Sequence, residues 1–263
     1  MTNSSVLPPT PTPTPYESLT TLLKRLKLGH FLSDWQTIEH RATQENWSYA
    51  QFLLALAEGE ASRRDQARIA RALSEAQLPC GKSWSNFEFS HVPSLNPAVI
   101  MQLAQTTDWL ETASNVLIFG PSGTGKTHAS IALGRSMIEL GKRVKFLPAT
   151  TLVQQLQQAK LQLQLPALLL KLDRYDLLIL DDLGYVKKSE AETSVLFELI
   201  AHRYERRSLL ITANQPFSQW ESIFTDSMMT VAAIDRLIHH ATILEMKAES
   251  FRKQAAISRS NAA

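Results

Sequence analysis

The sequence predicts an α/β fold, a parallel sheet flanked by helices, preceded by a small all-helical N-terminal domain. Three observations predict this fold: aliphatic runs alternate with helical stretches from residue 115 onward, apolar residues recur at helical spacing before residue 77, and a proline-containing stretch separates the two regions. With 263 residues, 44% of them hydrophobic and 20% charged, the chain has the composition of a globular protein and room for a small domain and a large one.

The N-terminal part divides into a leader and a helical domain. Residues 1–15 are the predicted leader, because Pro8–Pro15 contains only proline and threonine and such a stretch stays extended and solvated. Residues 16–85 are the predicted helical domain, with helices expected to begin after Ser18 and after Ser48. Prolines and a glycine within residues 77–97 indicate a linker, so we expect the second domain over residues 86–263.

Strands and helices are expected to alternate in the C-terminal region. A short helix should run from Pro97 to about Gln105, with Asn96 as its N-cap. The expected strands are 115–119, 143–147, 177–180 and 209–212, and the expected helices are 126–140, 151–165 and 189–206. Pro166 is expected to stop the helix that precedes it. The continuous aliphatic run Leu177–Leu180 is typical of a parallel strand buried on both faces.

Charge, cysteine content and hydropathy exclude several classes of protein. The formal net charge of +2 is too small to identify a polyanionic partner. Cys80 is the single cysteine, which excludes an intramolecular disulfide and a metal cluster held by cysteines alone. The N-terminus lacks the basic start and apolar core of a signal peptide, and no apolar run approaches the roughly 20 residues of a membrane helix. We therefore expect a cytoplasmic protein.

A phosphate-binding loop follows the first expected strand. The eight residues fit the pattern G-x-x-x-x-G-K-[ST] at every position, and they are Gly120, Pro121, Ser122, Gly123, Thr124, Gly125, Lys126 and Thr127. The glycines let the backbone wrap closely around a phosphate, while the loop N–H groups and the following helix N-terminus present positive potential. Lys126 should reach the β and γ phosphates and Thr127 should ligate Mg²⁺, so the sequence predicts MgATP binding.

Two acids follow the aliphatic strand Leu177–Leu180 directly. Ligands of open α/β sheets bind at the carboxyl ends of the strands, where Asp181 and Asp182 are expected to lie. We expect Asp181 to anchor Mg²⁺ and Asp182 to act as the base or to orient the attacking water. A pair of acids beside a P-loop favours hydrolysis of ATP over its storage.

The P-loop, together with LLILDDLGY, RYERRSLLITANQPFSQW and AIDRLIHHATILEMKAESFR, resembles the IstB family, the ATPase helpers of bacterial insertion-sequence transposition. That family is itself similar to the bacterial helicase loaders. The resemblance covers nearly the whole chain after the leader, including the helical segment SYAQFLLALAEGEASRRDQARIARAL. Because the family belongs to the AAA+ ATPases, the resemblance implies a AAA+ P-loop NTPase fold.

The resemblance also assigns roles that composition alone could not. Asn214 matches the polar sensor that positions water against the γ phosphate, Arg236 matches the arginine finger offered to a neighbouring subunit's ATP, and Arg252 matches a second sensor. It further implies a homo-oligomer with ATP sites at subunit interfaces, binding to double-stranded DNA without strong sequence preference, and contact with a cognate transposase.

The sequence departs from the wider AAA+ pattern at two places. Those enzymes usually carry glutamate where Asp182 stands, and the shorter side chain leads us to expect slow hydrolysis. The chain also ends soon after Arg252, which leaves little room for a helical lid domain; IstB-like proteins likewise lack one.

Candidate DNA contacts lie in both regions. Arg64, Arg68 and Arg71 share one face of an expected helix and form a candidate phosphate-binding stripe, although neighbouring acids could equally make it an ordinary solvated face. Further candidates in the second domain are Lys145, Lys160, Lys171, Lys187 and Lys188. The five tryptophans are expected in the core or at a domain interface and not as platforms for stacking bases.

Three other functions remain open on the sequence alone. A helicase loader of related design would bind single-stranded DNA and a replicative helicase. A small-molecule kinase could use the same P-loop fold, although no second substrate-binding lid is evident. A nucleotide-binding scaffold without hydrolysis would require Asp182 to be misplaced.

Overall fold

A computed structural model describes residues 14–183, 189–215, 219 and 227–248, with the backbone only for residues 227–230. Its contacts divide the chain into two compact units, Met1–Ala70 and Arg71–Ala263. Helix α3 (Tyr49–Ala76) runs across this division. The domain boundary near residue 85 therefore stays a prediction.

Among the described residues, no helix is both long and apolar enough to cross a membrane.

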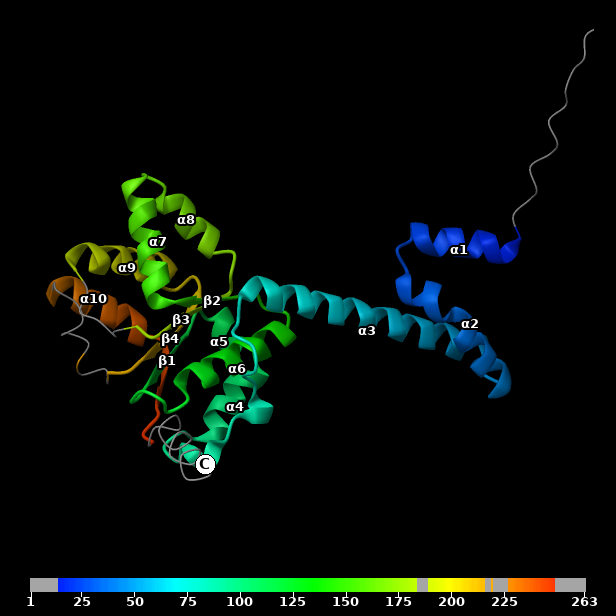
Figure 1. Ribbon diagram of the computed structural model, residues 1–263, viewed down its shortest axis with the longest axis horizontal. Helices are drawn as coiled ribbons and strands as arrows, with labels where there is room; N and C mark the ends of the chain where they lie inside the picture. The colour runs from blue at the N-terminus through cyan, green and yellow to red at the C-terminus, as the bar shows by residue number, and fades with distance from the viewer. Residues whose placement is uncertain (1–13, 184–188, 216–218, 220–226, 249–263) are drawn as a thin grey trace, which may run out of the picture. The chain divides into compact units, whose positions relative to one another are not determined.

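The first unit contains α1 (Pro15–Arg25), α2 (Gly29–Gln44) and most of α3 (Figure 1). Helix α1 begins before the expected start at Ser18, because Thr14 and Glu17 form a reciprocal capping box with Pro15 in the first turn. The start of α3 after Ser48 is confirmed, and the Ser48 hydroxyl accepts a hydrogen bond from the backbone N–H of Gln51 at 3.3 Å.

One buried carboxylate joins α3 to the first turn of α2. The side chain of Glu60 is 8% exposed; its Oε2 accepts the backbone N–H of His30 at 2.7 Å and its Oε1 accepts Arg64 Nε at 2.8 Å. The N-cap residue of α2 is Leu28, whose side chain accepts no hydrogen bond from the N–H groups of the first turn. Glu60 therefore acts as a cap supplied by another helix.

The second unit is built on a five-stranded sheet in the order β2-β3-β4-β1-β5, and every paired neighbour is parallel. The strands are β1 (Asn115–Phe119), β2 (Val144–Pro148), β3 (Leu177–Asp181), β4 (Ser208–Ala213) and β5 (Ala241–Glu245). The four expected strands are confirmed to within a residue or two. The edge strand β5 was not predicted, because it carries only one buried side chain, Leu244.

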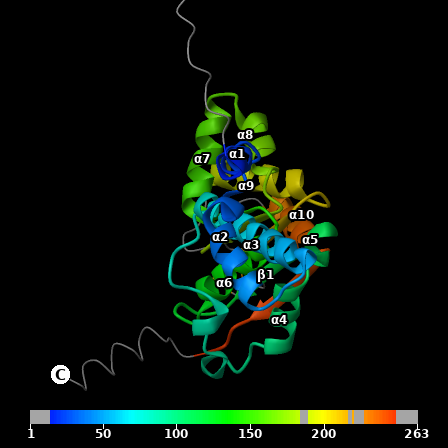
Figure 2. The same cartoon turned by 90° about the vertical axis from the view of Figure 1, so that its right-hand side faces the viewer.

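Helices cover both faces of the sheet, as Figures 1 and 2 show. On one face lie α4 (Pro97–Gln105) and α6 (Lys126–Glu139), with the short α5 (Asp108–Glu111) nearby. On the other lie α7 (Ala149–Leu161), α8 (Leu165–Leu172), α9 (Glu190–Arg203) and α10 (Ser227–Ile238), which share one apolar core with β1, β3 and β4. The expected α/β architecture is confirmed.

The expectation that Pro166 stops the preceding helix was wrong. This proline was expected to end a helix, but it lies in the first turn of α8, where a missing N–H leaves no hydrogen bond unmade. The preceding helix α7 ends at Leu161, and Leu163 takes a left-handed conformation with φ 57° between the two helices. Asn96 and Pro97 start α4 as expected.

The expected linker belongs to the second unit. Residues 77–97 contain two 3₁₀ turns, Trp84–Asn86 and Phe89–His91. The Trp84 indole N–H donates to Ser136 Oγ on α6 at 3.0 Å, and Phe87, Val92 and Leu95 are buried. The segment is therefore part of the structure that surrounds the carboxyl edge of the sheet.

Candidate functional site

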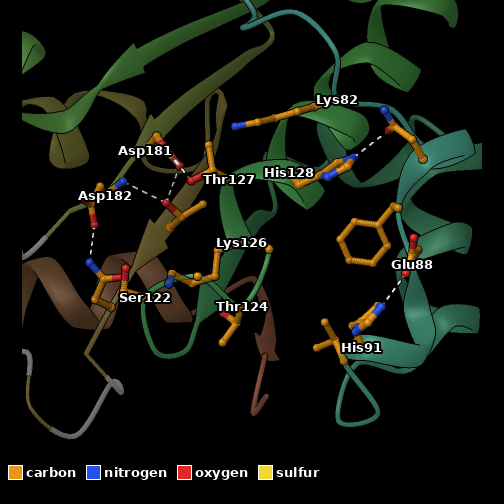
Figure 3. A pocket seen from close by; sticks show the side chains of 17 residues that line it. Lys82, Glu88, His91, Ser122, Thr124, Lys126, Thr127, His128, Asp181 and Asp182 are labelled. Carbon is orange, nitrogen blue, oxygen red and sulfur yellow. Dashed lines mark hydrogen bonds and ion pairs between the residues drawn. The ribbon is translucent and has the colours of Figure 1, made fainter. Parts of the chain in front are cut away.

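A pocket of about 580 Å³ opens at the carboxyl ends of the central strands (Figure 3). The residues around it come from the P-loop, the ends of β3 and β4, and the segment before α4. They are Lys82, Asn86, Phe87, Glu88, His91, Val92, Ser122, Gly123, Thr124, Gly125, Lys126, Thr127, His128, Asp181, Asp182, Thr212 and Asn214. Its volume lies within the range of about 300 to 1,000 Å³ usual for ligand pockets.

The P-loop connects β1 to α6 through backbone conformations that favour glycine. Gly123 and Gly125 have φ of 84° and 97°, and Gly125 is the N-cap of α6. Gly120, with φ 151°, approaches the edge strand so closely that a Cβ there would lie 2.2 Å from the carbonyl oxygen of Met246. The loop's path is therefore fixed by its own glycines and by the end of β5.

The Lys126 ammonium group lies inside the loop. The residue is 6% exposed, and Nζ donates to the carbonyl oxygens of Gly120 and Pro121, each at 2.7 Å. These two carbonyl oxygens hold the positive charge of Lys126 against the loop. The contact expected between Lys126 and a phosphate stays a prediction.

The hydroxyl groups of Thr127 and Thr212 hold the two oxygens of Asp181. Thr127 Oγ1 donates to Asp181 Oδ2 at 3.0 Å, and Thr212 Oγ1 donates to Asp181 Oδ1 at 2.7 Å. A carboxylate and a hydroxyl in contact are hard oxygen ligands of the kind that Mg²⁺ takes in nucleotide sites. The two residues expected to hold the metal therefore lie together and fit it chemically.

Asp182 has a left-handed backbone conformation, with φ 64°, and its carboxylate turns toward β4. Asn214 Nδ2 donates to Asp182 Oδ1 at 2.6 Å, and the backbone N–H of Asp182 donates to Thr212 Oγ1 at 2.9 Å. Asp182 is exposed, whereas Asp181 is half-buried. The structure thus brings together the predicted base and the predicted sensor at the open side of the pocket.

Thr212 and the pocket wall were not predicted from the sequence as parts of the site. Thr212 was included in an expected strand, and its position two residues before Asn214 was the available signal. The wall comes from the expected linker, where Phe87 lies edge-on to the His128 ring at 5.2 Å between centroids. His128 Nε2 lies 3.0 Å from both the Ser83 carbonyl oxygen and Asn86 Oδ1, which ties the wall to α6.

Arg236 lies outside the pocket formed by its own chain. It is half-buried on α10, its Nη1 donates to the carbonyl oxygen of Ala232 at 2.9 Å, and its guanidinium lies 5.3 Å from the Phe197 ring centroid. Arg236 is not among the residues that surround the pocket. Arg252, the predicted second sensor, lies outside the described residues.

Several candidate DNA contacts are engaged within the chain. Arg64 pairs with Glu60, and Arg68 pairs with Asp65 at 3.4 Å. Lys160 pairs with Glu198 at 2.7 Å, and Lys145 Nζ donates to the carbonyl oxygen of Glu75. Burial lowers the pKa of Lys145, and nearby Lys171 lowers it further. Lys187 and Lys188 lie outside the described residues.

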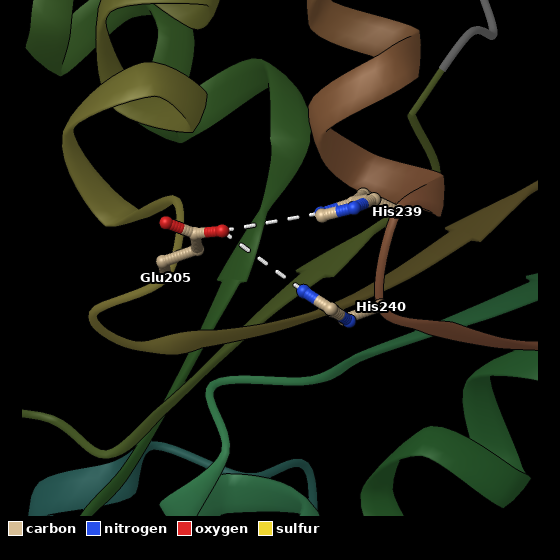
Figure 4. A group of neighbouring side chains, drawn as sticks. All are labelled: Glu205, His239 and His240. Atoms are coloured by element: carbon tan, nitrogen blue, oxygen red, sulfur yellow. Dashed lines mark ion pairs between the residues drawn. The ribbon is translucent and has the colours of Figure 1, made fainter.

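A second group of possible metal ligands lies at the opposite ends of the strands, where Glu205, His239 and His240 gather (Figure 4). Glu205 Oε1 lies 4.0 Å from His239 Nδ1 and 4.0 Å from His240 Nε2. Ligands of one zinc ion lie closer, about 3.4 Å apart for bonds of about 2.1 Å. The Tyr204 hydroxyl also lies 2.8 Å from His239 Nδ1. The group has the geometry of exposed ion pairs.

Comparison with known proteins identifies the family. The family model of the IstB-like ATP binding protein matches residues 21–259. An insertion sequence ATP-binding protein of Sinorhizobium fredii is 50% identical over 236 residues, 90% of this chain and 79% of the relative. An insertion sequence IS21 ATP-binding protein of Pseudomonas aeruginosa is 36% identical over 234 residues, 89% of this chain and 88% of the relative.

Solved structures support the fold. The DnaC helicase loader superposes with a TM-score of 0.50 and 18% identity, over 57% of this chain and 87% of that one. AMPPCP-bound DnaA from Aquifex aeolicus gives a TM-score of 0.54 and 19% identity, over 71% of this chain and 57% of that one. The chain therefore belongs to the family of IstB-like ATP-binding proteins, and it is an ATPase with the AAA+ fold.

Proposed function

We propose that this ATPase is the DNA-binding helper of an insertion-sequence transposition system. ATP promotes its assembly into an oligomer on double-stranded DNA in the cytoplasm, the assembly remodels the DNA and recruits or stimulates a cognate transposase, and hydrolysis resets it. The observation that carries the proposal is the pocket formed by the P-loop and the strand ends, with Asp181 and Asp182 in different hydrogen-bond environments, in a chain of the IstB family.

The pocket assigns a role to each group around a bound ATP. Lys126 and the loop N–H groups bind the β and γ phosphates, and Phe87, which lines the pocket, covers the base. Mg²⁺, held by Thr127 and Asp181, would neutralise charge that develops on the phosphates. Asp182 and Asn214 orient the attacking water, and Asp182 accepts its proton.

Arg236 acts on the ATP of a neighbouring subunit. Two observations support this role: its separation from the residues of its own pocket, and its place on α10, three residues before the turn into β5. A planar, permanently charged guanidinium suits the stabilisation of charge in phosphoryl transfer. Because each site then needs a second subunit, hydrolysis requires assembly, and loss of the γ phosphate removes a contact across the interface.

The trans role is tested by mixing two inactive variants. Lys126→Ala removes nucleotide binding but leaves Arg236 intact, whereas Arg236→Ala leaves the pocket intact but supplies no arginine. We expect each variant alone to lose about 10³-fold in hydrolysis and the mixture to recover a substantial fraction of wild-type turnover. A mixture as inactive as its components, in a preparation shown to form mixed oligomers, would contradict the trans role.

DNA binding is tested with duplex and single-stranded DNA of the same sequence, with and without ATP, at several salt concentrations. Cooperative, ATP-dependent binding to the duplex that weakens with salt supports the transposition helper, since non-specific binding depends on phosphate contacts. A clear preference for single strands would instead favour a helicase loader. Stimulation of a cognate transposase, measured as strand transfer, tests the partner directly.

A further inference from the structure

We propose that Thr212 is the positioning residue that gives the two acids their separate roles. Its hydroxyl holds Asp181 ready for Mg²⁺ and holds the backbone of Asp182 so that the second carboxylate faces the attacking water. The inference rests on the proposed Mg²⁺-dependent hydrolysis of ATP and deepens it.

A single hydroxyl group serves both acids. Thr212 Oγ1 donates its hydrogen to Asp181 Oδ1 at 2.7 Å and accepts the backbone N–H of Asp182 at 2.9 Å. The directions are fixed, because a carboxylate oxygen only accepts and a backbone N–H only donates. Thr212 is 1% exposed and both bonds are partly buried, which strengthens them relative to bonds in open solvent.

The first bond sets the orientation of Asp181. With Oδ1 held by Thr212 and Oδ2 by Thr127, both oxygens of the carboxylate have a hydroxyl partner, and rotation of the carboxylate would break both bonds. Thr127 and Asp181 would hold Mg²⁺ together, and the bond from Thr212 would keep the Asp181 carboxylate oriented while they do so. Without the Thr212 hydroxyl, the Asp181 carboxylate would have to be oriented each time the metal binds, which weakens metal binding.

The second bond sets the direction of Asp182. Its left-handed conformation, φ 64°, is one that residues with a side chain adopt rarely and keep only where surrounding contacts hold them. Thr212 supplies two such contacts: its hydroxyl accepts the Asp182 N–H, and its carbonyl oxygen accepts the N–H of Leu183 at 2.8 Å. In this conformation the Asp182 carboxylate reaches Asn214 at 2.6 Å.

Threonine is also the right shape for this position in a strand. Its branched side chain restricts the first torsion angle, so the hydroxyl stays directed at the neighbouring strand. Thr212→Val keeps the shape and removes the hydroxyl, whereas Thr212→Ser keeps the hydroxyl. Thr193→Val is the matched control, because Thr193 is also 1% exposed and its hydroxyl donates to the carbonyl oxygen of Ser189, away from the pocket.

The experiment measures the dissociation constant of a fluorescent ATP analogue with and without Mg²⁺, and then the hydrolysis rate. For Thr212→Val we expect affinity without Mg²⁺ within about twofold of wild type, a Mg²⁺-dependent gain in affinity reduced about tenfold, and hydrolysis reduced about 10²-fold. Thr212→Ser should recover most of both losses, and Thr193→Val should behave as wild type.

Unchanged Mg²⁺ dependence and hydrolysis in Thr212→Val would overturn the proposal, and so would an equal loss of affinity with and without Mg²⁺. If Thr212→Val does not fold, Thr212→Ala and Thr212→Ser, which differ by the hydroxyl oxygen alone, decide the same point. A wild-type protein that does not hydrolyse ATP would instead refute the proposed function. The two failures are therefore distinguishable.

Discussion

The side-chain amide of Asn214 donates a 2.6 Å hydrogen bond to the carboxylate of Asp182, between the ends of the neighbouring strands β4 and β3. The bond joins a residue assigned by family resemblance to one assigned by its position after an aliphatic strand. It brings a carboxylate and a side-chain amide together on the open side of the same pocket.

Asp182→Asn should keep ATP binding and lose hydrolysis by about 10² to 10⁴-fold, because an amide cannot accept the proton of the attacking water. The variant should also hold the ATP-bound assembly longer than wild type does. Single-turnover hydrolysis and size-exclusion chromatography with ATP measure both effects. A loss of nucleotide binding as severe as that of Lys126→Ala would show that Asp182 has a different role.

Lys126→Ala should abolish nucleotide binding at micromolar concentrations, because it removes the only cation among the P-loop residues and leaves the carbonyls of Gly120 and Pro121 facing the pocket without it. Lys142→Ala is the matched control, since Lys142 lies on the same unit and pairs with Glu111 away from the pocket. Calorimetric titration with ADP checks both variants. Similar affinities in the two would contradict the role of Lys126.

Phe87→Ala should weaken the binding of ADP and ATP about equally, by roughly tenfold, because in the proposed arrangement Phe87 covers the base and does not contact the γ phosphate. Phe89→Ala is the control, since this ring lies 4.8 Å from Phe87 between centroids but does not line the pocket. Competition binding with both nucleotides measures the change. A selective loss for ATP would place Phe87 beside the phosphates instead.

Gly120→Ala should destabilise the second unit by several kcal/mol, on the order of 3, because the new Cβ would overlap the carbonyl of Met246 and force β5 away. Gly81→Ala is the control, because Gly81 also has a positive φ, 78°, but has open space around it. It therefore introduces backbone strain without a clash. That control should cost about 1 kcal/mol. Chemical denaturation measures both, and equal losses would mean that the contact with Met246 does not matter.

The capping role of Glu60 predicts a pH dependence of stability. The backbone N–H of His30 and then the Arg64 guanidinium hold the pKa of the Glu60 carboxyl below its ordinary value of 4.5. A lowered pKa means that the ionised form stabilises the fold above about pH 4.5, and that this contribution is lost as the pH falls through the native pKa.

Glu60→Gln should therefore lower the melting temperature at pH 7, and the difference from wild type should shrink below about pH 4.5. Circular dichroism of the full chain at both pH values provides the measurement. Glu58→Gln, on the exposed surface of the same helix, should show neither effect. If the difference in melting temperature between wild type and Glu60→Gln grew on acidification, the capping role would be refuted.

Local sequence was sufficient to predict most of the elements. Pro97 after Asn96 and the glycine pattern of the P-loop each act within a few residues of the chain, so their signals are present in a short window. The aliphatic run of β3 predicted a doubly buried strand for the same reason. Pro166 shows the limit of such signals, since proline can either end a helix or begin one.

By itself the sequence determined the fold class, the phosphate-binding loop and the presence of two acids beside it, because these depend on residue type and short spacing. Only the tertiary structure decided that Thr212 bonds to Asp181, 31 residues away, that Phe87 lines the pocket, and that Arg236 does not. These relationships follow from the order of the strands and from the packing of the expected linker on α6, which no short stretch of the sequence specifies.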